Sequence, residues 1–280
     1  DPLRTNKSSF EYWAGGGLDR MNSLDQSRET NMQCSLVAAL AIVLLTAGVN
    51  SANAGIIVLD ETTFTTGFNK SSTHTFTNDA LGGFDVTGYD KLVFVASSEG
   101  IDNLLSVTYG GVALTEAVTA ASANRGSFIY YLDNPTVNGD LFVQGDSSGN
   151  GIGGTLFGLT GTQAGVGNTD TAGSGSSNAT NVATFNASLG SIVIGSGTGN
   201  NNAAVVDAPQ TAITFGLNVG SAFHSAGYQL VDPAGSVDAS FSASRVVAAA
   251  EFLATPIPEP GSLAMLGVGG LMLLTIHRRR

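Results

Sequence analysis

Apolar and polar residues alternate along much of the chain between residues 55 and 254. The clearest case is the run 237–244, Val-Asp-Ala-Ser-Phe-Ser-Ala-Ser, whose period of two is typical of a half-buried β-strand. Residues 106–109 and 112–115 alternate in the same way around Gly110-Gly111, which predicts a hairpin because both turn positions need positive φ. Shorter apolar runs predict strands buried on both faces: residues 92–96, 128–132, 141–143, 192–194 and 246–250, of which the last is also compatible with a helix.

Segments rich in Gly, Asn and Asp separate these runs. They include 133–135, 145–151 and the longest one, 161–181, which we expect to be a surface loop. Many short strands, no helical pattern and no clear fixed-period repeat predict an all-β fold, an antiparallel jelly-roll-like β-sandwich over residues 55–254. In an alternative that remains open, the loop 161–181 separates two smaller sandwiches.

We interpret residues 1–54 as a spurious upstream extension followed by a signal peptide. Residues 36–49 are uncharged, and the run is too short to span a membrane comfortably. Ala52 and Ala54 then supply the A-x-A pattern that signal peptidase recognises, which predicts an N-terminal signal helix and cleavage before Gly55. The alternative is a buried core helix.

Composition and charge exclude several functions for the middle of the chain. Residues 55–255 hold sixteen acidic and four basic residues, a net charge of −12, and such a surface repels phosphate, so we expect no nucleic-acid partner. The only cysteine, Cys34, precedes the expected cleavage site, which excludes disulfides, thiolate metal sites and thiol catalysis from the mature domain. The 37 glycines and the low share of charged residues, 12%, are typical of strands joined by tight turns.

Residues 255–280 are organised differently from the domain before them. Three prolines within 255–260 exclude a helix and a central strand, so this segment is expected to be a stiff, extended spacer. Residues 261–276 are uncharged and predict a short C-terminal transmembrane helix of about 24 Å, which is marginal for a hydrocarbon core. Three arginines follow and would stop translocation on the cytoplasmic side: Arg278, Arg279 and Arg280.

The triplet Pro258-Glu259-Pro260, the apolar run and the arginines, in this order and behind a signal peptide, resemble the PEP-CTERM sorting signal of Gram-negative envelope proteins. The resemblance covers about the last 25 residues. It implies that an exosortase, a membrane protease-transpeptidase, reads the tail, and that the protein accompanies exopolysaccharide export. The alternative is a simple tail anchor preceded by an incidental proline linker.

The middle of the chain carries a second, weaker resemblance. The run 106–115 followed by 129–135, Ile-Tyr-Tyr-Leu-Asp-Asn-Pro, is similar to a β-sandwich module that recurs in secreted bacterial proteins. That resemblance implies the fold and no particular activity.

Motifs for catalysis are scarce in the expected mature domain. His74 occupies an alternating position in Thr-His-Thr-Phe, so we expect it to face solvent, and with the distant His224 it makes a poor zinc site. No G-x-S-x-G elbow of a serine hydrolase is present. The glutamates available for the paired carboxylates of a glycoside hydrolase are Glu61, Glu99, Glu116 and Glu251, and none lies in a motif.

Ligand sites are equally weakly marked. Residues 149–154 have glycines at a phosphate-loop-like spacing, but no Lys-Ser/Thr follows them, so we predict a turn. Asp146 and Asn150 are weak candidates for calcium coordination, and we expect no other metal or cofactor.

Two classes of function remain, and neither is enzymatic. The first is an exported envelope or extracellular-matrix protein of structural or interaction type, associated with exopolysaccharide. The second is a carbohydrate-binding module, and a glycoside hydrolase is the least expected. The tyrosines available to stack on sugar rings are Tyr130, Tyr131 and Tyr228, although strand tyrosines more often belong to the core. The expected partners are signal peptidase, an exosortase-type protease and, through the C-terminal helix, the membrane.

Overall fold

The computed structural model describes residues 57–65, 71–176 and 179–256, and these residues form sixteen β-strands and no helix. Every strand pairing is antiparallel, which confirms the predicted all-β sandwich. The expected signal helix and C-terminal transmembrane helix lie outside the described residues. Within the described part of the chain, no helix is long and apolar enough to cross a membrane.

The first half of the domain consists of two facing sheets. The inner sheet has the order β1-β9-β3-β7-β6 and the outer sheet the order β2-β8-β4-β5. The inner strands are β1 (Ile57–Thr65), β3 (Lys91–Glu99), β6 (Thr115–Ala121), β7 (Arg125–Asp133) and β9 (Gly151–Thr160). The outer strands are β2 (Ser71–Phe76), β4 (Leu104–Tyr109), β5 (Val112–Ala113) and β8 (Leu141–Gly149).

The second half is built around one long strand, β16 (Gly235–Phe252). Its later residues join the inner sheet, of order β10-β16-β12-β15-β14, and its earlier residues pair with β11 and β13. The strand changes sheet near Ala243, which has a φ of 53°, and the pairing with β12 shifts register there. The other strands are β10 (Thr169–Gly173), β11 (Ala179–Ala187), β12 (Ile192–Asn200), β13 (Val205–Val206), β14 (Thr211–Val219) and β15 (Ala222–Leu230).

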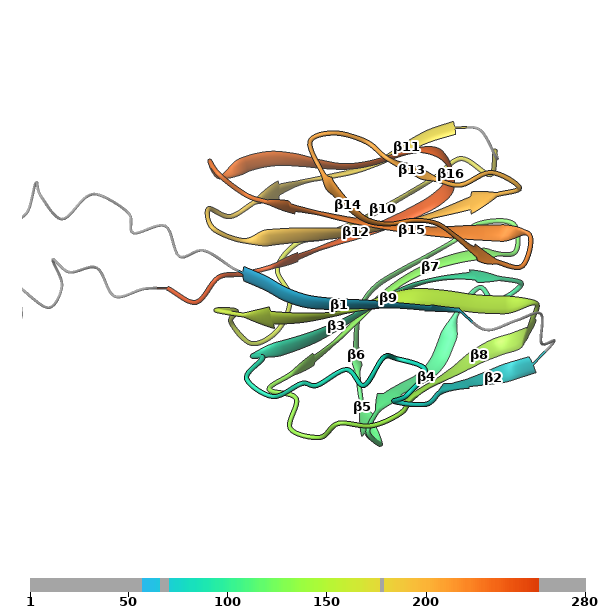
Figure 1. The fold of residues 1–280 in the computed structure, drawn as a ribbon. Helices are drawn as coiled ribbons and strands as arrows, with labels where there is room; N and C mark the ends of the chain where they lie inside the picture. The colour runs from blue at the N-terminus through green and yellow to red at the C-terminus, as the bar shows by residue number, and fades with distance from the viewer. Residues whose placement is uncertain (1–56, 66–70, 177–178, 257–280) are drawn as a thin grey trace, which may run out of the picture. The chain divides into compact units, whose positions relative to one another are not determined.

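The same strand order therefore occurs twice. The inner sheet of the first half, β1-β9-β3-β7-β6, corresponds to the inner sheet of the second half, β10-β16-β12-β15-β14. The outer strands β2-β8-β4 correspond in the same way to β11-β16-β13. The long strand β16 therefore takes the places of both β8 and β9. Each half has the two-sheet arrangement of a jelly roll. Residues 161–168 connect the halves, and Figure 1 shows the two inner sheets facing each other in the middle of the stack.

Several strands lie where the alternation predicted them. The hairpin across Gly110-Gly111 is confirmed, and both glycines have positive φ, 56° and 80°. The run 237–242 alternates between buried and more exposed side chains, as predicted, but the prediction was wrong for the last two positions of 237–244, because the strand bends at Ala243 and Ser244 is buried. Residues 246–250, which the sequence allowed as a helix, are a strand with every side chain buried.

The glycine-rich segments were predicted wrongly. Residues 151–154 are part of β9 rather than a turn, and most of 145–151 belongs to β8 and β9. The expected loop 161–181 contains β10 and the start of β11. β10 is polar because it is an edge strand whose side chains are all at least partly exposed, so its composition resembles that of a loop.

These glycines are in strands because neighbouring atoms leave no room for a side chain. A Cβ on Gly153 would lie 2.3 Å from Val219 Cγ1, and a Cβ on Gly197 would lie 2.4 Å from Phe241 Cδ1. Glycine in a strand often marks such a close approach. The Gly-Ser-Gly-Thr-Gly run 195–199 thus places small residues under Phe241 and hydroxyls on the opposite face.

Substitution of these strand glycines is expected to be costly. A Cβ on Gly154 would lie 2.4 Å from the backbone oxygen of Val95, so Gly154→Ala should destabilise the domain by about 1–3 kcal/mol, as other overpacked sites do. Gly173→Ala is the matched control, since a Cβ at this position would lie no closer than 3.4 Å to its nearest neighbour, the backbone oxygen of Arg245. Thermal unfolding of both variants tests this, and equal melting temperatures would contradict it.

The core consists of three apolar layers separated by the two inner sheets. One layer lies between the outer and inner sheets of the first half, and a second lies between the two inner sheets. The third covers the far face of the second inner sheet and includes Phe241. Alternate residues of β3 show this division, since Leu92 and Phe94 belong to the first layer and Val93 and Val95 to the second.

The chain enters and leaves the described domain at the same end of the stack, which we call the proximal end. Ile57 is paired with Thr160, and Ala254 forms a bridge with Thr162. Figure 1 shows the start of β1 and the end of β16 side by side. We call the opposite end, where β3 and β12 finish at Glu99 and Asn200, the distal end.

Candidate functional site

The residues of the predicted sorting and cleavage sites lie outside the described part of the chain. They are Ala52, Ala54, Pro258, Glu259, Pro260, Arg278, Arg279 and Arg280. The candidates inside the domain can be placed, and each has a defined environment.

The prediction that His74 faces solvent was wrong. Its side chain is 4% exposed, because the buried positions of β2 are His74 and Phe76 and the exposed ones are Thr73 and Thr75. The ring Nε2 lies 3.0 Å from Ser71 O. Burial lowers the pKa of His74, and the contact with Ser71 opposes that shift only in part.

The three tyrosines do not form a sugar-stacking surface. Tyr130 is buried in the layer between the sheets of the first half, and Tyr131 is buried in the layer between the halves. Tyr228 is partly buried against that second layer. Among the side chains whose burial is described, the exposed large apolar ones are aliphatic, for example Leu105 and Leu230.

The four glutamates are held by different groups rather than paired with one another. Glu99 accepts hydrogen bonds from Ser221, and Glu116 accepts one of 3.1 Å from Tyr130 Oη. Glu251 is fully buried and accepts hydrogen bonds from the backbone N–H groups of Ser188 and Asn168. Glu61 is exposed on β1.

The calcium candidates are not brought into one cluster. Asp146 is exposed, and its Oδ1 accepts hydrogen bonds from Ser147 Oγ at 3.1 Å and Asp102 N at 3.4 Å. Asn150 lies at the turn after β8 and donates its backbone N–H to Glu99 O. Among the described residues, no group of three or more His, Cys, Asp and Glu side chains is placed to hold a metal.

The main concentration of polar side chains lies between the two halves. On β3 and β7, the first and last paired positions are charged in opposite senses: Lys91 faces Asp133, and Glu99 faces Arg125. Both pairs form ion pairs. The interface between the halves thus has one ion pair at its proximal end, apolar residues beside it, and a second ion pair at its distal end.

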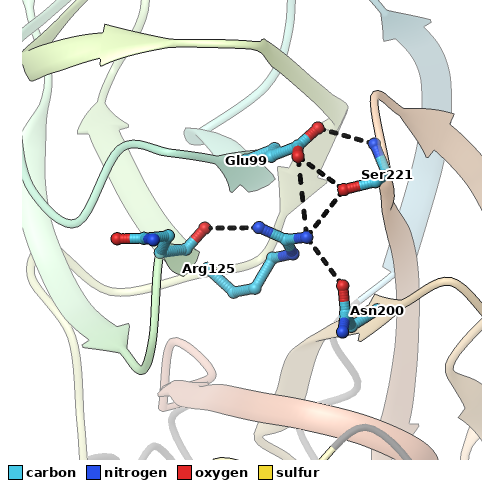
Figure 2. Close-up of polar contacts among 5 residues, drawn as sticks. Glu99, Arg125, Asn200 and Ser221 are labelled. Atoms are coloured by element: carbon cyan, nitrogen blue, oxygen red, sulfur yellow. Dashed lines mark hydrogen bonds and ion pairs between the residues drawn. The ribbon is translucent and has the colours of Figure 1, made fainter.

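Figure 2 shows the distal cluster, which joins both halves of the domain. Arg125 Nη2 lies 3.6 Å from Glu99 Oε1 in the first half. The same nitrogen donates to Asn200 Oδ1 at 2.6 Å and Ser221 Oγ at 2.8 Å in the second half. Ser221 also donates its backbone N–H to Glu99 Oε2 at 2.6 Å.

Hydrogen bonding keeps this cluster ionised despite its burial. Burial by itself would raise the pKa of Glu99, but hydrogen bonds from Ser221 and Asn150 and the positive charge of Arg125 outweigh it and lower the pKa below its ordinary value. Burial lowers the pKa of Arg125, and the Glu99 carboxylate opposes that shift. A guanidinium nevertheless stays charged in proteins, so the cluster is a true ion pair.

A layer of uncharged polar groups lies next to the distal cluster. His224 Nδ1 is 2.9 Å from Ser97 Oγ, and its Nε2 is 3.3 Å from Thr155 Oγ1. Thr214 Oγ1 lies 2.8 Å from Thr155 Oγ1, and Thr198 Oγ1 lies 2.6 Å from Ser97 Oγ. Burial lowers the pKa of His224 to about 3, so the ring is neutral at pH 7.

A serine beside a histidine suggests nucleophilic catalysis, but the surroundings do not fit. Ser97 and His224 are each 0% exposed, so a substrate has no route to the hydroxyl. The nitrogen that an orienting carboxylate would contact in a triad lies beside Thr155. We assign this layer to alignment of the two halves, since a buried polar network fixes one arrangement of the packed sheets.

The sequence did contain one signal for these clusters. Only four basic residues occur between residues 55 and 255, and two of them precede predicted buried strands: Lys91 comes directly before 92–96, and Arg125 three residues before 128–132. A cation at that position must be paired when the strand is buried. The partners, however, are 42 residues away for Lys91 and 122 residues apart for Glu99 and Ser221.

No protein-family model matches the chain, and no curated protein shows significant similarity to it.

Proposed function

We propose that this chain is an exported protein of the cell envelope or extracellular matrix, of structural or interaction type and without catalytic activity. The observation that carries the proposal is the order of elements after the domain: Pro258-Glu259-Pro260, an uncharged run, then Arg278, Arg279 and Arg280. In this proposal an exosortase-type protease reads the triplet, after signal peptidase has acted at Ala52 and Ala54.

The described domain supports a passive role. Many of its buried polar residues lie between the halves, where they are hydrogen-bonded to one another. Its net negative charge favours solubility outside the cell and disfavours nucleic acid. The chain enters and leaves the described domain at the proximal end, so the proposed anchor is connected to that end of the domain.

The structural role is preferred over carbohydrate binding for a specific reason. Sugar rings are commonly held against exposed aromatic faces, and the three candidate tyrosines are buried or half-buried here. Association with exopolysaccharide would then depend on polar and hydrogen-bonding contacts rather than on ring stacking.

The test is to replace Pro258, Glu259 and Pro260 together by alanine. Export and insertion should be retained, because the apolar run and the arginines are unchanged, but processing should be abolished. Mass spectrometry and membrane fractionation in a strain that carries the exosortase should show the full-length form accumulating in the membrane.

The control removes the three arginines and leaves the triplet intact. This change should release or misplace the chain, because each charge costs roughly 2.5–3.5 kcal/mol at the bilayer centre and holds the helix in position. If the alanine variant instead has the mass and distribution of the wild type, the sorting proposal fails and a simple anchor remains.

A further inference from the structure

Lys91 occupies an unusual position for a lysine. Its side chain is fully buried, at the first position of β3 and directly opposite Asp133, the last residue of β7. Its Nζ is in direct contact with Asp133 Oδ1. Amine and carboxyl are thus held together at the proximal end, between the two halves.

The surroundings of Lys91 disfavour its charged form. The Nζ lies 4.7 Å from the ring centre of Tyr131 and 5.8 Å from that of Phe252. Burial lowers the pKa of Lys91, and the carboxylates of Asp133 and Asp90 oppose that shift only in part. Loss of a proton from the ammonium leaves a desolvated neutral amine, and such an amine is a nucleophile.

The second oxygen of Asp133 is held separately. The backbone N–H of Gly165 donates to Asp133 Oδ2 at 2.8 Å. Nearby, the backbone N–H of Gly161 donates to Asp90 Oδ2 at 2.6 Å. The segment 161–165 therefore fixes both carboxylates, and the donor on Oδ2 is placed to stabilise negative charge that develops on that oxygen.

We propose that Lys91 and Asp133 form an intramolecular amide bond, so that the domain carries its own covalent cross-link between β3 and β7. The Nζ attacks Cγ of Asp133, and a C–N bond forms. The bond from Cγ to Oδ1 breaks, and Oδ1 leaves as water with two of the three ammonium protons. Oδ2 becomes the amide oxygen, the third proton stays on nitrogen, and no oxidant or cofactor takes part.

Asp90 is assigned the role of proton carrier in this step. The negative charge of Asp90 raises the pKa of Lys91, and the Asp90 carboxylate is positioned by the same segment, 161–165, that holds Asp133. A carboxylate can accept a proton from Nζ and return it to the departing oxygen. It is not consumed, so one turnover per molecule completes the reaction.

The other ion pair of the same two strands provides an internal comparison. Glu99 and Arg125 are also buried and face each other, but a guanidinium is not deprotonated in proteins and cannot act as the amine does. The chemistry is therefore restricted to the proximal end, where a lysine takes the place of the arginine.

The test is a tryptic digest of the denatured full-length protein, followed by mass spectrometry. Between residues 71 and 245, unlinked protein is cut after Lys91 and Arg125 and gives fragments 71–91, 92–125 and 126–245. An acylated lysine is not cut, so the cross-link predicts one branched species, 71–125 joined to 126–245 and lighter by one water molecule. Fragmentation should place the junction at Lys91 and Asp133.

Two variants define the role of each residue. Lys91→Met should give no branched species, and Asp90→Asn should slow its appearance while both linked residues remain. Recovery of free, unmodified 71–91 and 92–125 from folded wild-type protein would overturn the proposal and leave an ordinary buried ion pair. This outcome does not depend on processing of the tail, so it is separate from the test of the proposed function.

Discussion

Replacing Arg125 by methionine is expected to destabilise the folded domain by about 3–5 kcal/mol, the usual cost of removing one partner of a buried ion pair. The change leaves the Glu99 carboxylate buried without its cation and removes the donors to Asn200 and Ser221 in the second half. Glu99 keeps its hydrogen bond from the backbone N–H of Ser221, so we expect the loss of stability to lie near the lower end of that range. Urea denaturation at pH 7 measures it.

The double variant Arg125→Met with Glu99→Gln is the informative control. Because no unpaired charge remains buried in it, it should recover part of the lost stability, and the cycle isolates the coupling between the two residues. Arg245→Met removes the same charge from β16 but leaves the Glu99–Arg125 pair intact, and because Arg245 repels Arg125 this change should cost little stability. A loss in Arg125→Met no larger than in Arg245→Met would show that the ion pair does not hold the halves together.

Lowering the pH is expected to destabilise the domain already at pH values well above those at which carboxylates titrate. Burial depresses the pKa of His224 to about 3 from an ordinary value of 6.5, so the unfolded chain binds a proton that the folded one excludes. The contribution of neutral, buried His224 to the free energy of unfolding is complete above pH 6.5 and is lost as the pH falls from 6.5 toward 3. Between about pH 6.5 and 4.5 the loss from this residue should reach about 2–3 kcal/mol.

His74 contributes in the same direction, since burial lowers its pKa too. The carboxylates of Glu99 and Glu251 have lowered pKa values and lose their contributions at still lower pH, so they do not affect the upper part of the window. His224→Gln should flatten the stability profile between pH 6.5 and 4.5, and His74→Gln serves as the comparison in a different core layer. A flat wild-type profile in that window would refute the prediction.

Strand positions were predictable wherever the two faces of a strand differ in polarity. The run 237–242 and the hairpin at Gly110-Gly111 show this, because a single period or turn rule decides them. His74 shows the limit, since β2 alternates but its polar histidine belongs to the buried set. His74 and Phe76 are two residues apart and therefore share a face, so the alternation was consistent with burial and only the polarity of the imidazole led to the wrong prediction.

The repeated topology could not be seen in the sequence for a related reason. The strands of the second half that correspond to β8 and β9 are one continuous β16, and residues 195–199 of β12 alternate glycine with small polar residues, a pattern that β3 does not have. The candidate site was equally hidden, because Glu99 meets Ser221 only once both halves are folded. Scarce cations at strand starts were the one local indication.

The points at which the chain enters and leaves the described domain decide how the domain responds to mechanical load. A pull between the chain at Ala254 and a ligand held at the distal end runs along the strands of both inner sheets. The ladder hydrogen bonds lie across that direction, so many must break together. A pull that separates Ile57 from Ala254, by contrast, peels β1 from β9 one pair at a time. A domain of this topology that was held at its proximal end and loaded at its distal end would therefore bear tension in its stronger direction.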